Sequence, residues 1–227
     1  MKLTFRIDPS QEPKYLSVDI DTFVVAGWAG RDIAAIEHHI EELAALGVPR
    51  PSAVPLYYRV AENQLTQAAR VQVVGPDSSG EAEVFLFTAE GETYVSLSSD
   101  HTDRKQETQS VALSKQLCAK PVAMSAWPYA DVAEYWDELV IRSFIEENGR
   151  EVLYQEGPLA LLRPPLELLE RYLDGEAMRP GVAMSCGTVA AIGGIRPSPS
   201  FAMELYDPRR DRLLRHHYAI DFLPEIS

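Results

Sequence analysis

The segment GEAEVFLFTAEGETYVSLSSDHTDR, residues 80–104, places two apolar, strand-like runs on either side of Glu90-Gly91. Successive side chains of a strand point to opposite faces, so Glu81 and Glu83 share one face. If Glu90-Gly91 forms a two-residue hairpin turn, Glu81 directly faces Asp100 on the second strand. The segment therefore predicts a hairpin with three carboxylates on one face. A three-residue turn would shift the register by one residue and separate them.

Three neighbouring carboxylates repel one another, and protonation, water or a bound cation can relieve that repulsion. A site made only of oxygen ligands suits Mg²⁺, Mn²⁺ or Ca²⁺ better than Zn²⁺. The spacing alone leaves two interpretations open. Glu81, Glu83 and Asp100 form either a divalent-metal site or a solvated acidic face on an edge hairpin.

The composition is that of a globular protein with one sizeable core. The chain has 227 residues, of which 46% are hydrophobic and 24% charged. Its net charge of −13 disfavours binding to nucleic acids and to anionic membranes. The sequence shows no secretory signal pattern, and Cys118 and Cys186 form no CxxC pair. These features predict a cytoplasmic protein without disulfides.

The distribution of elements favours an α+β fold, because helices and strands alternate irregularly. Apolar residues at helical spacing, clearest at Ile33, Ile36, Ile40, Leu43 and Leu46, predict helices. The predicted helices cover residues 31–47, 108–118, 131–149 and 165–175. Alternating β-branched and apolar residues predict strands within 3–7, 15–27, 67–75, 80–104, 150–157, 181–194, 200–208 and 213–222.

Several short motifs, in order along most of the chain, resemble those of the fumarylacetoacetate hydrolase family. Gly80-Glu81-Ala82-Glu83 looks like the G-E-x-E segment of that family, and residues 99–104 look like its N-D-x-S-x-R segment. Further matching pieces are His39-Ile40-Glu41-Glu42-Leu43, the prolines before Leu56, Ser114-Lys115, Asn148-Gly149 with Gln155, Pro180-Gly181 and Cys186-Gly187-Thr188. The resemblance spans roughly residues 27–206 and is closest to a bacterial branch of unknown function.

The resemblance implies a mixed β-roll with peripheral helices and a helical lid. It implies one such domain over residues 1–227, with N-terminal strands and the lid helix within about residues 1–50. It also implies a homodimer. Glu81, Glu83 and Asp100 match the carboxylates that bind Mg²⁺ or Mn²⁺ in the family.

The resemblance also implies an activity and further site residues. It implies metal-dependent cleavage of a C–C bond in a 2-oxo acid or acylpyruvate-like substrate, by hydrolysis or decarboxylation through an enolate that the metal stabilises. His39 and Glu42 match the lid pair that activates water, and Lys115 matches a catalytic lysine. Arg104, Gly187 and Thr188 match substrate-binding residues.

Two alternatives remain beside this activity. One is hydratase or isomerase chemistry on a similar chelating substrate, and the other is a non-catalytic binding protein that keeps the fold. The sequence also departs from the family pattern. Where the family has small residues, His101 and Asp103 stand here, and the glutamine expected three residues after the arginine is Glu107.

Overall fold

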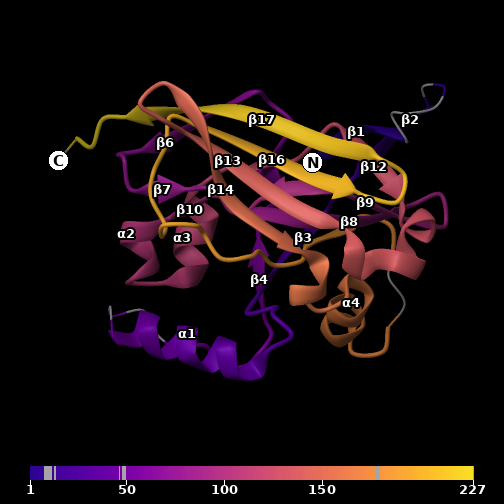
Figure 1. The fold of residues 1–227 in the computed structure, drawn as a ribbon, viewed down its shortest axis with the longest axis horizontal. Coiled ribbons are helices and arrows are strands. Elements are labelled where there is room, and N and C mark those ends of the chain that lie inside the picture. The colour runs from indigo at the N-terminus through magenta and orange to yellow at the C-terminus, as the bar shows by residue number, and fades with distance from the viewer. Residues whose placement is uncertain (8–11, 13, 46, 48–49, 177–178, 227) are drawn as a thin grey trace.

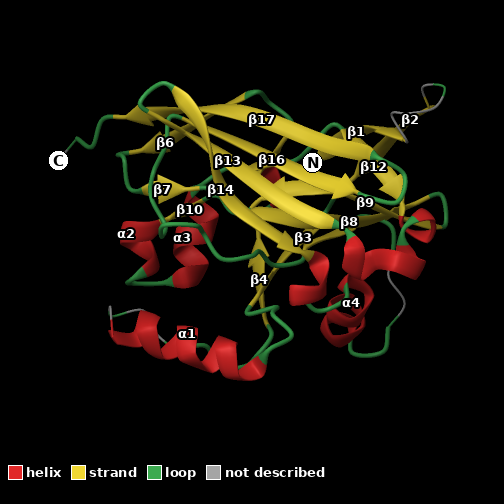
Figure 2. Cartoon of the chain, in the orientation of Figure 1, coloured by secondary structure: helices red, strands yellow, loops and turns green. Residues whose placement is uncertain are grey.

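The protein is built from two mixed β-sheets that pack together, with helices gathered along one edge (Figures 1 and 2). The computed structural model describes residues 1–7, 12, 14–45, 47, 50–176 and 179–226. In the first sheet the strand order is β2 (Lys14–Asp19), β1 (Lys2–Ile7), β12 (Ser125–Pro128), β9 (Glu92–Ser99), β8 (Ala82–Ala89), β15 (Val182–Ser185), β3 (Thr22–Gly27) and β4 (Leu56–Val60). In the second sheet it is β14 (Arg150–Pro158), β13 (Val140–Glu147), β16 (Ser200–Asp207), β17 (Arg212–Leu223) and β6 (Arg70–Val74). This arrangement confirms the predicted α+β fold with a mixed β-roll.

The hairpin of β8 and β9 lies at the centre of the first sheet and has the predicted register. Glu83 pairs with Ser98, and Ala89 pairs with Glu92 on either side of the turn. Glu90 and Gly91 both adopt positive φ angles, of 53° and 80°, as a two-residue hairpin turn requires. The turn therefore fixes which residues face each other at the opposite end of the hairpin.

Both faces of β8 are buried, which explains its almost unbroken apolar sequence. Val84 and Leu86 belong to the main core between the two sheets. Phe85 and Phe87 point to the other face, where Phe87 stacks on Phe5 with ring centroids 4.3 Å apart. The curled first sheet thus encloses a second, aromatic core, and the hairpin is held from both sides.

The predicted helix at residues 131–149 is wrong. Residues Val140–Glu147 form β13, which pairs with β14 on one side and β16 on the other. The β-branched residues of this segment alternate inward, with Ile141 and Ile145 buried. Hydrogen bonding to two neighbouring strands outweighs the weak helical periodicity. Only the part before β13 is helical, as 3₁₀ turns at Tyr129–Asp131 and Ala133–Glu138.

The other predicted helices are present with shorter bounds. The α-helices are α1 (Ile33–Ala45), α2 (Arg104–Glu107), α3 (Val111–Leu117) and α4 (Pro165–Leu173), with further 3₁₀ turns at Glu62–Gln64 and Leu159–Leu161. In α1, Ile36 and Ile40 are buried as expected, but Ile33 is half exposed. The side chains of Leu43 and Leu46 lie outside the described residues. None of the described helices is long and apolar enough to span a membrane.

Two small ladders join the hairpin to its surroundings. β7 (Ser78–Ser79) pairs with β10 (Thr102–Asp103), immediately beyond the open end of the β8–β9 hairpin. β11 (Lys120–Pro121) pairs in parallel with β5 (Leu65–Thr66). Ser78–Ser79, Thr102–Asp103 and the side chain of Lys120 therefore meet near the point where β8 begins and β9 ends.

Glu90→Asn should raise the free energy of unfolding by about 0.5–1 kcal/mol, because Asn tolerates the left-handed backbone better than Glu. The change also removes the ion pair with Lys14, but those exposed groups are 3.7 Å apart and contribute little. Asn148-Gly149 closes the β13–β14 hairpin with the same backbone, so Asn148→Glu should destabilise by a similar amount. Urea unfolding of both variants measures the effect. A less stable Glu90→Asn protein would contradict it.

Candidate metal centre

Glu81, Glu83 and Asp100 come together at the open end of the β8–β9 hairpin. One carboxylate oxygen from each lies within 4.8 Å of the others. The Asp100 backbone N–H donates to the carbonyl oxygen of Glu81 over 3.0 Å, so these two residues face each other as predicted. Glu83 and Asp100 are only 3% and 1% exposed, which excludes the solvated acidic face.

Two lysine side chains lie against the Asp100 carboxylate. Lys115, from α3, donates a short hydrogen bond to Asp100 Oδ2. Lys120, from β11, places its Nζ 3.3 Å from Asp100 Oδ1 and donates to the carbonyl oxygen of His101. Both lysines are buried, and Lys120 is fully so. Asp100 is therefore compensated by two cations before any metal is considered.

The sequence predicted Lys115 but missed Lys120. Lys120 lies among apolar residues in the stretch CAKPVA, which resembles the end of a helix more than a strand. A lysine inside an apolar run needs a buried anionic partner, and that requirement is the signal that could have identified it.

The charges set the protonation of the cluster. Burial opposes ionisation of Asp100, but the charges of Lys115 and Lys120 outweigh it and lower the pKa of Asp100 to about 2. Burial also opposes the charge on Lys115, yet Asp100 and Glu81 raise the pKa of Lys115 above its ordinary value. Burial lowers the pKa of Lys120. Asp100 is thus an anion at neutral pH, and Lys115 is a cation.

Glu83 is the carboxylate with the least compensation. Burial first, and then repulsion from Asp100 and Glu81, raise the pKa of Glu83 well above its ordinary value. Its Oε2 accepts a hydrogen bond from the Gly187 backbone N–H over 3.2 Å. A bound cation is the component that would favour the charged form of this side chain.

The donor set fits a divalent cation. All three groups are carboxylates, which are hard ligands of the kind that Mg²⁺, Mn²⁺ and Ca²⁺ prefer. Among the described residues, Asp100 Oδ1 is buried and accepts no hydrogen bond. Lys120 Nζ lies 3.3 Å from this oxygen as an ion pair, which leaves a second lone pair of Oδ1 for a metal. The predicted ligand set thus has both the geometry and the chemistry for such an ion.

Arg104 contacts the cluster from one side. It begins α2, and its guanidinium contacts Ser79, Glu81 and Glu107. The sequence predicted Arg104 as a substrate-binding residue. In the structure its guanidinium is occupied by these protein groups.

Gly187 and Thr188, the other predicted substrate-binding residues, lie in the loop after β15 and are held against β8. Gly187 has a φ of +84°, and a Cβ there would lie 2.6 Å from the side chain of Ala29. The Thr188 hydroxyl donates to the carbonyl oxygen of Ala82 over 2.7 Å. Glycine is therefore required here for the backbone N–H to reach Glu83.

Gln155 connects this loop, β8 and the second sheet. Its Oε1 accepts from the Ala82 N–H over 3.0 Å and from the Ser143 hydroxyl over 2.7 Å. Its Nε2 donates to Thr188 Oγ1 over 2.8 Å and to the carbonyl oxygen of Val189 over 2.6 Å. The family resemblance included Gln155, but its connecting role depends on residues 82, 143 and 188 meeting in the fold.

His101, which replaces a small residue of the family pattern, lies in a buried polar network behind Asp100. Its two ring nitrogens lie 3.0 Å from the hydroxyls of Tyr218 and Ser78. Burial lowers the pKa of His101 to about 3, so the ring is neutral. The network joins the Asp100–His101 segment to β17 and β7.

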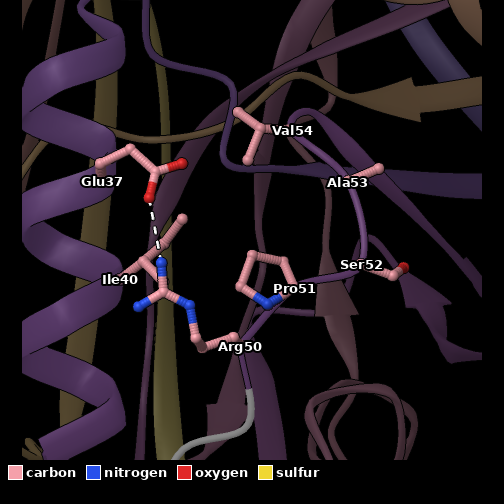
Figure 3. A pocket seen from close by; sticks show the side chains of 7 residues that line it. All are labelled: Glu37, Ile40, Arg50, Pro51, Ser52, Ala53 and Val54. Carbon is pink, nitrogen blue, oxygen red and sulfur yellow. Dashed lines mark hydrogen bonds and ion pairs between the residues drawn. The ribbon is translucent and has the colours of Figure 1, made fainter.

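His39 and Glu42, the predicted lid pair, both belong to α1, about forty residues before the carboxylate cluster in the sequence. Glu42 Oε1 lies 3.4 Å from Nε2 of His38, and the side chain of His39 lies outside the described residues. α1 borders a pocket of about 280 Å³ (Figure 3). There Glu37 pairs with Arg50 over 3.1 Å, beside Ile40. None of the residues that line this pocket belongs to the cluster.

Comparison with known proteins identifies a family and a fold. Residues 26–218 match the family described as protein of unknown function (DUF2848), and the chain belongs to that family. No curated protein matches its sequence significantly.

Solved structures match over almost the whole chain. A 2-keto-3-deoxy-D-arabinonate dehydratase complexed with magnesium and 2,5-dioxopentanoate is 14% identical, with a TM-score of 0.65, over 95% of this chain and 79% of that one. Cg1458 with an inhibitor is 13% identical, with a TM-score of 0.64, over 95% and 87%. The 4-oxalocrotonate decarboxylase from Pseudomonas putida G7, with calcium and acetate, is 18% identical, with a TM-score of 0.54, over 90% and 78%. These likenesses show the fold.

The raised pKa of Glu83 predicts a pH-dependent stability of the metal-stripped protein. Between the ordinary value of 4.5 and the raised value, the folded state holds a proton that the unfolded state has released. Stability therefore falls as the pH rises through this window. Glu83→Gln removes this loss and can keep the hydrogen bond from Gly187, so its stability advantage over wild type should grow with pH.

Urea unfolding of both proteins in a chelator, at about pH 5 and about pH 8, measures the difference. A difference that stays constant with pH would show that Glu83 titrates normally.

Proposed function

We propose that the protein is a divalent-metal-dependent enzyme that cleaves a C–C bond in a 2-oxo acid or acylpyruvate-like substrate. The observation that carries the proposal is the carboxylate cluster of Glu81, Glu83 and Asp100, two of whose members are almost fully buried. Burial of charged carboxylates destabilises a protein unless the charges are compensated. Lys115 and Lys120 compensate Asp100, which leaves Glu81 and Glu83 to be compensated by a cation or by Arg104.

Glu81, Glu83 and Asp100 would hold Mg²⁺ or Mn²⁺, and Ca²⁺ also suits such ligands. The bound ion would act as a Lewis acid that polarises the oxygens of the 2-oxo acid. When all three carboxylates are ionised they bring a charge of −3, so one divalent cation leaves a remainder of −1, which Lys115 alone offsets.

Lys115 is the residue proposed to stabilise the negative charge that develops on the substrate. Its ammonium is held at the cluster by Asp100, and its raised pKa keeps it charged. A fixed cation in a site with little water stabilises a developing oxyanion more than one in bulk solvent does. The loop of Gly187 and Thr188 borders Glu83 and is the proposed contact for the substrate carboxylate.

The similar structures support this chemical class without fixing the reaction. One is a dehydratase with magnesium and 2,5-dioxopentanoate, and another is a decarboxylase with calcium and acetate. Each combines this fold with a divalent cation and a small organic ligand. Hydrolysis requires an additional base that activates water, and His39 with Glu42 is the proposed pair.

The first prediction concerns the metal. Wild-type protein stripped of metal should bind one Mn²⁺ per chain, and Glu81→Gln and Glu83→Gln should each weaken that binding by more than about 100-fold. Glu92→Gln, at the other end of the same hairpin, is the control and should bind normally. Calorimetric titration measures all four proteins. Tight binding by both cluster variants would disprove the ligand assignment.

The second prediction concerns the reaction, measured with Mg²⁺- or Mn²⁺-loaded protein on a panel of 2-oxo acids and acylpyruvates. If an acylpyruvate is hydrolysed, His39→Ala should lower kcat by roughly 10²–10⁴, the usual contribution of a general base. His38→Ala should have little effect. His38 contacts Glu42, so a lowered kcat in His38→Ala, with normal kcat in His39→Ala, would assign the base to His38. Release of CO₂ at an unchanged rate in His39→Ala would indicate a decarboxylase.

A further inference from the structure

The Arg104 guanidinium is shared between the metal centre and a carboxylate outside it. Its Nε donates to the Ser79 hydroxyl over 2.7 Å, and its Nη1 donates to Glu107 Oε2 over 3.0 Å. Its Nη2 lies 2.9 Å from Oε1 of Glu81. Three protein groups therefore hold the three nitrogens in one orientation.

The contact with Glu81 depends mainly on charge. Among the described residues, Nη2 of Arg104 is buried and makes no hydrogen bond of good geometry, although Glu81 lies within ion-pair distance. Arg104 and Glu107 are each less than one-fifth exposed, as is Glu81, so solvent screens these charges weakly. The charge that Glu107 places beside Arg104 is therefore felt at Glu81.

We infer that Glu107 is a positioning residue for the metal centre, acting through Arg104 on Glu81. Its carboxylate fixes the guanidinium and neutralises part of its charge, so Glu81 is oriented by Arg104 yet retains its affinity for a cation. The inference rests on the proposed metal site and adds a residue that the ligand set does not include.

The local structure makes Glu107 suited to this role. It lies three residues after Arg104 on α2, where side chains at that spacing meet. Asp103 caps this short helix by accepting from the Gln106 backbone N–H over 2.9 Å. A neutral side chain at position 107 would leave the whole positive charge of Arg104 directed at Glu81 and repelling a metal ion.

The test compares Mn²⁺ affinity in Glu107→Gln, Glu107→Asp and Glu225→Gln proteins. Glu107→Gln keeps the size and an acceptor oxygen but loses the charge, so Mn²⁺ binding should weaken on the order of tenfold. Glu107→Asp keeps the charge and should bind close to wild type. Glu225 is exposed and pairs with Lys105, which lies on α2 beside Glu107. Glu225→Gln therefore controls for the change in net charge.

Calorimetric titration gives the Mn²⁺ affinities. Thermal unfolding of the metal-free proteins shows whether a change in affinity is accompanied by a loss of stability. A weakened Glu107→Gln, with Glu107→Asp and Glu225→Gln near wild type, supports the inference. Wild-type Mn²⁺ affinity in a folded Glu107→Gln protein overturns it. The inference also fails if Glu107→Asp, or the control Glu225→Gln, weakens Mn²⁺ binding as much as Glu107→Gln does. Should Glu107→Gln not fold, a Glu107→Asp protein with weakened binding would overturn it. Failure of wild type to bind Mn²⁺, or normal binding by Glu83→Gln, would instead refute the metal site.

Discussion

The buried ion pairs around Asp100 are the constraint on which the rest of the site depends. A carboxylate that is 1% exposed must be compensated, and here Lys115 and Lys120 reach it from α3 and β11. These contacts fix α3 against the open end of the hairpin and bring β11 beside it. Glu83 then lies buried beside Asp100 and Glu81, and burial first and their repulsion second raise the pKa of Glu83.

The same constraint determines what the burial of the cluster requires. A surface site could rely on water to separate three carboxylates, but a buried one needs fixed charges at fixed distances. Arg104 supplies one such charge to Glu81, and Gly187 supplies a backbone N–H to Glu83. The fixed positions of these groups mean that a ligand would meet a prearranged set of donors and acceptors.

Local sequence rules predicted the centre of the fold better than its surroundings. The register of β8 and β9 could be predicted because a two-residue turn at Glu90-Gly91 determines every cross-strand pair. The position of Lys120 could not, since it depends on β11 pairing with β5, more than fifty residues earlier in the chain. The helix expected at residues 131–149 failed for a related reason. Pairing of Val140–Glu147 with two strands is a tertiary effect that periodicity does not contain.

Gln155 has a consequence for how the protein can change its shape. One amide bonds simultaneously to β8, to β13 and to the loop of Thr188, so it links both sheets to the backbone between the two glutamates. A hinge motion between the sheets would have to break these bonds and would leave buried polar groups unpaired. The spacing of Glu81 and Glu83 is therefore held in part by a side chain from the other sheet, so any shift of one sheet against the other would be transmitted directly to the carboxylates.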